Sequence, residues 1–264
     1  MRASRAGTWR GWVLALFLVW APSTWAAASR AIPFAPFSDW AGVVVSGDDQ
    51  AAHADIRTQA FDNARRDVTA EFERRGFLAA HLAQFSVSGA ANATPARIGP
   101  IFDRLGALTQ TASGGCLVYL TSHGAPQGAL VGDALLTPAA AARAIGRVCA
   151  ERPTAIILSA CFSGTFLPTL AGPDRFVFTA ARRDRSSFGC GEGDRYPFFD
   201  GCVIEDLPAA RDFVDLADRV RRCVSAREDR EGMRPRSQPQ LFVGKDFSAR
   251  LRPFGVRGSA ASAP

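Results

Sequence analysis

Short apolar runs alternate along the chain with stretches in which apolar residues recur at helical spacing. Six runs have the length and composition of buried strands, namely residues 42–46, 82–87, 116–121, 154–159, 175–180 and 240–243. Helical spacing is clear between residues 60 and 72, and Gly76 ends that pattern. The alternation predicts an α/β fold with a mostly parallel central sheet of about six strands and helices on both faces.

Further segments complete the predicted order of elements. Residues 98–108 form a second helical pattern, and Thr137 and Pro138 supply an N-cap and a first-turn proline for a third. Residues 128–135 have the pattern of a small hairpin, and Pro208 is expected to open a last long helix. Residues 182–205 are Gly-rich and charged without periodicity, which is typical of a functional or disordered loop.

The first 28 residues have the features of a secretory signal peptide. Three arginines precede an apolar stretch at 12–20, and residues 26–28 offer a small-residue cleavage site. A membrane anchor is the alternative, but spanning a bilayer needs about 20 apolar residues, and Pro22 interrupts this shorter run. We expect a signal peptide (1–28), one folded domain (29–257) and a disordered tail (258–264). The protein is then exported to the periplasm or secreted, without a stable membrane anchor.

Charge and cysteine content narrow the function. The net charge is +6, and without the three arginines of the first 28 residues it is +3. This weak excess does not favour nucleic-acid binding, which needs a clustered basic face. All six cysteines lie after residue 28, without a CxxC pair, and the three histidines are far apart, so neither a zinc site nor a cofactor is expected. Cys190 and Cys202 are the best candidates for a disulfide, whereas Cys149 and Cys223 are equally well explained as buried thiols.

Two of the predicted strands end next to chemically reactive residues. The strand at 116–121 leads into His123 and Gly124, and the strand at 154–159 leads into Cys161. In open parallel sheets, ligands bind outside the carboxyl ends of the strands, and neighbouring strands are about 4.8 Å apart. A histidine and a cysteine at that edge suit a base or acid and a nucleophile. The pattern predicts a cysteine hydrolase.

The order strand-His-Gly, then strand-Ala-Cys, resembles the caspase-haemoglobinase group of cysteine peptidases. The flanking residues are similar to those of legumain-like peptidases in the stretches 55–64, 122–131 and 159–166, and more weakly in 179–201. The resemblance extends over residues 40–206. It implies a caspase-like sandwich for the domain and peptides or proteins as substrates.

The resemblance also implies catalytic roles. Cys161 would be the nucleophile, its thiolate favoured if the following residues begin a helix. His123 would be the general acid that protonates the leaving amine. Gly124 and Cys161 would supply N–H groups to an oxyanion hole. Asp55 stands where the family has an asparagine, and it either orients His123 or merely caps a helix.

Three residues resemble residues of the family's specificity pocket. Arg57 matches the arginine of that pocket, whose guanidinium suits the side-chain carbonyl of asparagine or the carboxylate of aspartate. Ser186 resembles a lining serine. Asp200 resembles an acidic residue that accepts from an asparagine amide and would repel aspartate. The alternatives are a solvated arginine for Arg57 and a turn aspartate for Asp200.

Three functional hypotheses follow. The first is a cysteine endopeptidase that cleaves after Asn, with Asp as a second candidate, through an acyl-thioester on Cys161. The second is a transpeptidase or ligase that passes the same acyl group to an amine. The third is an exported binding protein that keeps the fold without activity. The sequence leaves natural substrates, activation and oligomeric state open.

Overall fold

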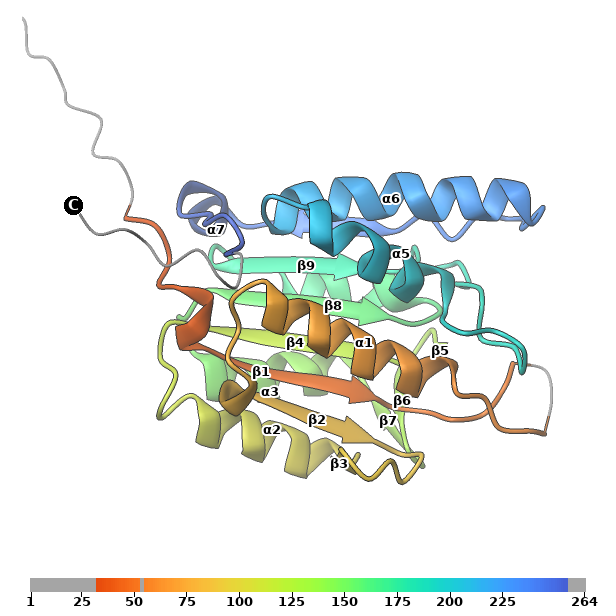
Figure 1. The fold of residues 1–264 in the computed structure, drawn as a ribbon, viewed down its shortest axis with the longest axis horizontal. Helices are drawn as coiled ribbons and strands as arrows, with labels where there is room; N and C mark the ends of the chain where they lie inside the picture. Colours follow the sequence, from red (N-terminus) through yellow and green to blue (C-terminus); the bar gives the residue numbers. More distant parts are fainter. Residues whose placement is uncertain (1–31, 53–54, 256–264) are drawn as a thin grey trace, which may run out of the picture. The chain divides into compact units, whose positions relative to one another are not determined.

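The computed structural model describes residues 32–52 and 55–255. The expected signal peptide and the expected disordered tail fall outside these residues. The central element is a seven-stranded sheet with the order β10-β9-β8-β4-β1-β2-β3 (Figure 1). Its strands are β1 (Trp40–Ser46), β2 (Leu82–Ser86), β3 (Thr94–Pro95), β4 (Gly115–Thr121), β8 (Thr154–Ser159), β9 (Arg175–Thr179) and β10 (Gln240–Val243). All pairs are parallel except that of β10 with β9.

The sheet confirms the predicted α/β class and its mostly parallel character. The β3 segment is an additional edge strand of two residues, too short to leave a periodic signal. β1, β4 and β8 are buried along their whole length, which explains why their sequences are continuous apolar runs.

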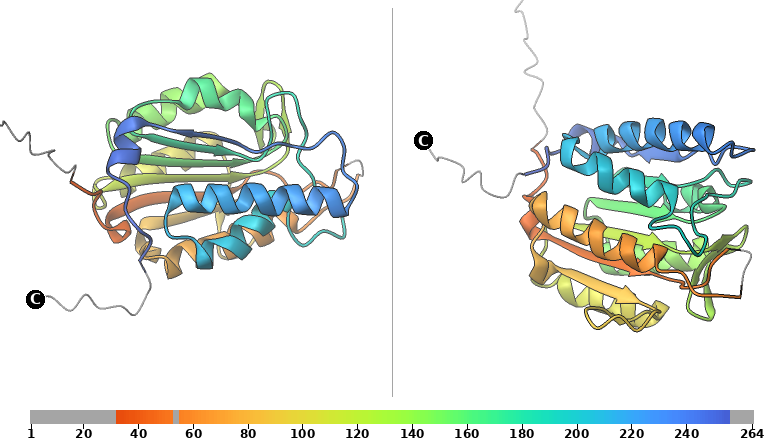
Figure 2. Two further views of the ribbon diagram at one scale, coloured as in Figure 1. Left: turned by 90° about the horizontal axis from the view of Figure 1, so that it is seen from above. Right: turned by 45° about the vertical axis from the view of Figure 1, so that its right-hand side comes forward.

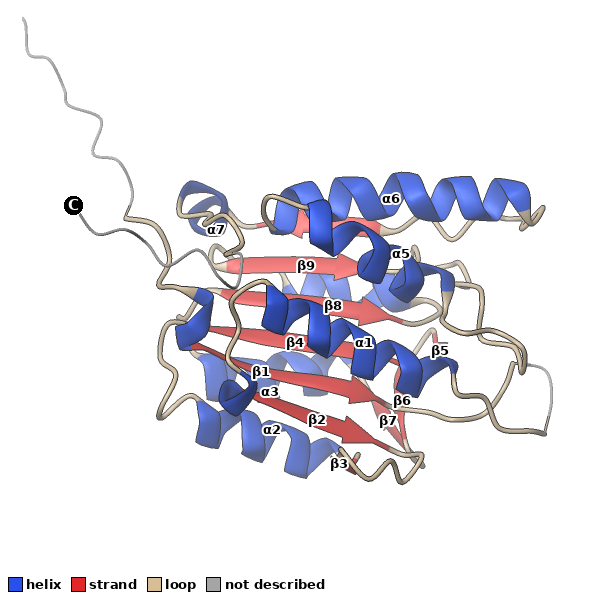
Figure 3. Cartoon of the chain, viewed as in Figure 1, coloured by secondary structure: helices blue, strands red, loops and turns tan. Residues whose placement is uncertain are grey.

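Helices cover both faces of the sheet, as Figures 2 and 3 show. On one face α1 (Ala60–Arg74), α5 (Phe198–Asp206), α6 (Phe213–Arg230) and α7 (Lys245–Ala249) share an apolar core with the sheet. On the other, the helices are α2 (Ile98–Leu108), α3 (Pro138–Cys149) and α4 (Leu167–Leu170). Alternate residues of β4 enter the two cores, with Tyr119 on the first side and Val118 on the second. None of the helices in this described part is long and apolar enough to cross a membrane.

A small antiparallel sheet follows β4 directly. It consists of β5 (Gly124–Ala125), β6 (Gly128–Val131) and β7 (Ala134–Leu136), in the region where a hairpin was predicted. Thr137 caps α3 as expected, because its side chain accepts a hydrogen bond from the Ala140 N–H.

The start of the last long helix differs from the sequence prediction. Pro208 lies in a short 3-10 turn, Leu207–Ala209, and α6 begins only at Phe213. The side chain of Asp212 accepts from the N–H groups of Val214 and Asp215, so this aspartate is the cap that fixes the start of the helix. The last third of the predicted loop 182–205 is also helical, because α5 begins at Phe198.

The expected Cys190–Cys202 disulfide is wrong. The structure pairs Cys116 with Cys149 and Cys202 with Cys223, with Cα–Cα distances of 6.1 Å and 5.7 Å. The first bond joins the start of β4 to the end of α3, and the second joins α5 to α6. Proximity in sequence is a poor guide here, because packing of helices brings distant cysteines into bonding range.

Candidate active site

The ends of β4 and β8 form the base of the site. These strands are parallel neighbours, and their last residues, Thr121 and Ser159, are paired in register. The Ser122 N–H donates to the Ser159 carbonyl at 3.0 Å and continues the pairing beyond the strands. His123 and Cys161 each follow two residues after these paired ends. The predicted sharing of one sheet edge by the two residues is therefore observed.

Close packing of Gly124 against Cys161 brings the two segments into contact. A Cβ atom added to Gly124 would lie 3.2 Å from the carbonyl carbon of Cys161 and 3.0 Å from the Cβ of Ala160. Only a residue without a side chain fits this approach. His123 and Cys161 thus flank a direct backbone contact between the two strand ends.

The sulfur of Cys161 is half-buried and in contact with Ser187. The Ser187 N–H donates to the Sγ atom at 3.2 Å, and the carbonyl and hydroxyl oxygens of Ser187 lie 3.6 Å from it. Cys161 is not part of a disulfide. The sequence pattern pointed to the neighbouring Ser186, which is exposed and does not share this contact within the described residues. The choice between adjacent serines depends on the direction of the loop, which no periodic pattern reports.

The segment after Cys161 is only partly helical. Phe162 is left-handed, with φ of 57°, and its N–H donates to the Arg185 carbonyl at 2.8 Å. A 3-10 turn (Ser163–Phe166) and the four-residue α4 follow. The expected helix at this position is therefore two short turns, and the cumulative dipole of a longer helix is missing.

A main-chain carbonyl orients the ring of His123. Its Nε2 atom lies 2.9 Å from the carbonyl oxygen of Gln50, and the ring of Phe61 meets it edge-on at 5.0 Å between centroids. Because a carbonyl can only accept, Nε2 carries the hydrogen, and in the neutral ring Nδ1 is the free acceptor. Asp55 is exposed and makes no hydrogen bond to His123 in the described part of the chain. The expected orienting role of Asp55 is thus taken by the Gln50 carbonyl.

The segment around residues 49–58 also positions Arg57. The Arg57 guanidinium pairs with the Asp49 carboxylate, and the two side chains are 70% and 12% exposed. Gln50 and Arg57 form an antiparallel bridge that holds the segment together. An arginine that is accessible yet fixed by a largely buried carboxylate is able to bind a polar side chain bidentately.

The long loop between β9 and α5 lies against this segment. The Thr58 hydroxyl donates to the Gly191 carbonyl at 2.9 Å, and the Ala52 N–H donates to the Cys190 carbonyl at 2.8 Å. Asp194 accepts from the Gly191 N–H at 2.6 Å. Burial and the charges of Cys161 and Asp194 raise the pKa of the Cys190 thiol to about 12. Cys190 and Asp194 are therefore neighbours of the site that the sequence did not reveal, although both lie in the loop that it predicted to be either functional or disordered.

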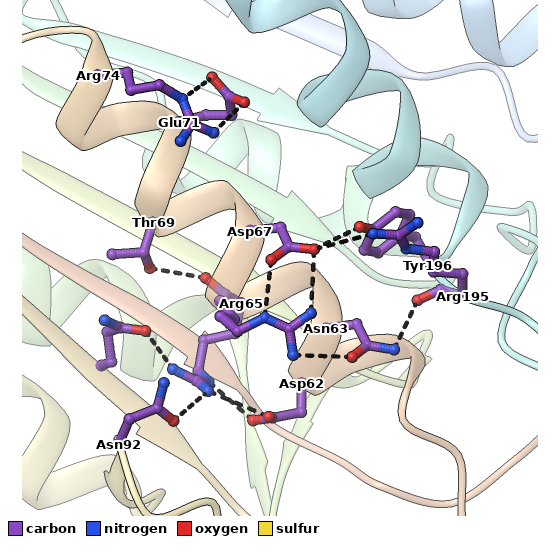
Figure 4. A network of polar contacts seen from close by, with 12 residues as sticks. Asp62, Asn63, Arg65, Asp67, Thr69, Glu71, Arg74, Asn92, Arg195 and Tyr196 are labelled. Carbon is purple, nitrogen blue, oxygen red and sulfur yellow. Dashed lines mark hydrogen bonds and ion pairs between the residues drawn. The ribbon is translucent and has the colours of Figure 1, made fainter.

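Helix α1 anchors the far end of the same loop (Figure 4). The Tyr196 hydroxyl donates to Asp67 at 2.5 Å, and the Asn63 side-chain amide donates to the Arg195 carbonyl at 3.3 Å. Burial acts to raise the pKa of Asp67, but hydrogen bonds from Arg66 and Tyr196 outweigh it and hold the pKa below its usual value. The loop is thereby fixed at Cys161, at the segment around residue 58 and at α1.

Asp200 is not at a surface that a substrate reaches. Its side chain is 0% exposed and accepts hydrogen bonds from Tyr119, Thr121 and Ser159. The expected contact between Asp200 and a substrate side chain is therefore wrong for this structure, because α5 turns this residue inward under the strand ends. Within residues 32–52 and 55–255, no group of three or more His, Cys, Asp or Glu side chains could hold a metal ion.

Comparison with known proteins agrees with this arrangement. Residues 104–202 match the model of the Peptidase C13 family. This stretch contains β4, the small sheet, β8 and the loop, with both His123 and Cys161. This part of the chain is similar to the Peptidase C13 family. C13 peptidases are the legumain-like cysteine peptidases that the sequence resembles, so this expectation is confirmed.

The fold has a solved counterpart. The structure of caspase-1 from Spodoptera frugiperda superposes with a TM-score of 0.63 at 15% identity, covering 88% of this chain and 96% of that one. At this identity the likeness shows the caspase-like fold alone. A search of curated proteins finds no significant match.

Proposed function

We propose that this protein is a cysteine endopeptidase that cleaves peptide bonds after asparagine. The observation that carries the proposal is the contact of the two strand ends, with His123 and Cys161 on either side of the packed Gly124. The match of residues 104–202 to a cysteine peptidase family supports the same chemistry.

The reaction begins when Nδ1 of His123 takes the proton of the Cys161 thiol and the sulfur attacks the carbonyl carbon of the scissile amide. The resulting oxyanion accepts hydrogen bonds from the N–H groups of Gly124 and Cys161. His123, oriented by the Gln50 carbonyl, gives the proton on Nδ1 of its imidazolium form to the leaving amine, and the C–N bond breaks. Water then attacks the thioester while His123 takes up one of its protons. The C–S bond breaks, His123 returns that proton to the sulfur, and the carboxylic acid product leaves with the thiol and the neutral histidine regenerated.

Arg57 and nearby carboxylates support a preference for asparagine. The guanidinium donates to the side-chain carbonyl of an asparagine, while a carboxylate accepts from its NH2 group. Asp49 pairs with Arg57, and Asp194 lies in the adjoining loop. A substrate aspartate would meet these negative charges, so we expect asparagine to be favoured over aspartate. Two disulfides support action outside the cytoplasm, in keeping with an exported protein.

The direct test is a cleavage profile of the purified protein on a peptide library, with the Cys161→Ala variant as the inactive control. We expect cleavage after asparagine, less cleavage after aspartate, and none by the control variant. Mass spectrometry of the products locates each cut. Cleavage that persists in Cys161→Ala, or wild-type cleavage with no preference for the residue before the cut, would reject the proposal.

A further inference from the structure

We propose that Asp200 is a positioning residue that clamps together the two strand ends that carry His123 and Cys161. This inference rests on the proposed function. In it, the buried carboxylate of Asp200 fixes the distance between Cys161 and His123. It differs from the specificity role that the sequence suggested.

The hydrogen bonds of Asp200 show the clamp directly. Its Oδ2 atom accepts from the Thr121 hydroxyl at 2.8 Å and from the Ser159 hydroxyl at 2.6 Å. Its Oδ1 atom accepts from the Tyr119 hydroxyl at 2.5 Å. Thr121 and Ser159 are the last residues of β4 and β8 and are register partners. One carboxylate oxygen thus joins the two strands at their final residues.

The clamp acts close to the reacting groups. His123 lies two residues beyond Thr121, and Cys161 lies two residues beyond Ser159. Asp200 itself lies in the first turn of α5, directly after the loop that contacts the Cys161 sulfur through Ser187. Asp200 therefore connects both strand ends and the loop. A displacement of about 1 Å between the groups that these segments carry is able to lower the reaction rate roughly a hundredfold.

The contribution of Asp200 to folding stability does not explain why a carboxylate is buried at this position. Burial raises the pKa of Asp200 to about 6, although hydrogen bonds from Ser159, Tyr119 and Thr121 act to lower it. The folded state therefore favours the protonated form between the ordinary carboxyl pKa of 3.8 and about 6, and that stabilisation is lost as the pH rises through about 6. Above this window the protein holds a charged, buried carboxylate at a cost to folding, which is typical of functional groups.

Few other charges face Asp200. The titratable groups around it are Tyr119 of β4, whose pKa burial raises well above its usual value, and Cys190 of the loop. Arg227 of α6 packs against Gly201 but pairs with Glu205. Within the described residues no cation forms an ion pair with Asp200. The three hydroxyls are thus its direct partners, and protonation of the carboxyl forces at least one of them to rearrange.

The test compares Thr121→Val with Thr121→Ser. Valine has the shape of threonine without the hydroxyl, whereas serine keeps the hydroxyl and loses the methyl group. We expect Thr121→Val to lower kcat roughly tenfold or more on an asparagine-containing peptide, with KM within about twofold, because one hydrogen bond to a charged acceptor is lost. Thr121→Ser should restore most of the wild-type kcat. Melting curves show that both variants are folded at the assay temperature.

A second measurement uses Asp200→Asn and does not need peptidase activity. The rate at which iodoacetamide modifies Cys161, followed by peptide mass spectrometry between pH 5 and 8, reports the surroundings of the thiol. We expect the pH profile of this rate to differ between wild type and Asp200→Asn in the region near pH 6. If Asp200→Asn does not fold, the Thr121→Val and Thr121→Ser proteins are compared in the same assay.

The outcomes separate the two proposals. Wild-type protein that cleaves no peptide rejects the proposed function, and the alkylation profiles still test the clamp. An active wild type with unchanged kcat in folded Thr121→Val, or with equal losses in Thr121→Val and Thr121→Ser, overturns the clamp. Identical alkylation profiles in wild type and folded Asp200→Asn overturn it as well.

Discussion

The segment around residues 49 and 50 holds both His123 and Arg57, the proposed proton donor and the proposed substrate-binding cation. The Gln50 carbonyl fixes the Nε2 atom of His123, and the Asp49 carboxylate pairs with Arg57. A displacement of this short segment would therefore disturb both side chains together. Under the proposed function, such a displacement would affect substrate preference and proton transfer at the same time.

Substitution of Arg57 tests its role in substrate binding. We expect Arg57→Gln to lower kcat/KM for asparagine-containing peptides roughly tenfold to a hundredfold, because a hydrogen bond from a charged donor is lost. Arg74→Gln is a matched control, since Arg74 is 59% exposed and pairs with Glu71, which is 11% exposed, at the other end of α1. It should stay within about twofold of wild type. Equal losses in both variants would show that Arg57 does not contact substrate.

At the scale of elements, the loop between β9 and α5 is the part that completes the site. It has no regular structure from residue 180 to 197, yet it is fixed by Ser187 at Cys161, by Gly191 at Thr58 and by Tyr196 at α1. Three separate anchors reduce the conformational freedom that a long loop would otherwise have. The order of this loop is therefore a result of its side-chain contacts.

Removal of one anchor should loosen the loop without stopping the chemistry. We expect Tyr196→Phe, which loses the hydrogen bond to Asp67, to raise KM a few-fold and to leave kcat nearly unchanged. Amide exchange of residues 186–197 should become faster. Thr111→Val, which removes a hydroxyl contact at the end of α2, is the control. Slower amide exchange, or a loss confined to kcat, would contradict this account of the loop.

The sequence predicts the periodic elements and the catalytic pair, but not the contacts that depend on loop direction. The six longer strands of the central sheet and α1 to α3 follow from the apolar pattern, and the placement of His123 and Cys161 at one sheet edge follows from the geometry of parallel strand ends. The turn of α5 that buries Asp200 and the choice of Gln50 over Asp55 depend on tertiary packing. The disulfides depend on it in the same way, because their partners lie 33 and 21 residues apart.

For the molecule as a whole, the sheet serves as a rigid base, and the reactive groups lie in the segments beyond its strand ends. Two buried cores, one on each face, fix β4 and β8 from both sides. The disulfides tie helices on both faces, α3 to β4 and α5 to α6. Such a base holds catalytic groups in place at little additional entropic cost during the reaction.

The most direct measurement of the central claim is the cleavage rate of one asparagine-containing peptide by wild type, Cys161→Ala, His123→Ala and His81→Ala. His81 is the matched control, because its ring contacts the Ser38 carbonyl at the start of β2, at the opposite end of the strands. We expect the first two variants to lose at least roughly a thousandfold in rate and His81→Ala to stay close to wild type. Folded His123→Ala or Cys161→Ala protein that cleaves at the wild-type rate would contradict the account.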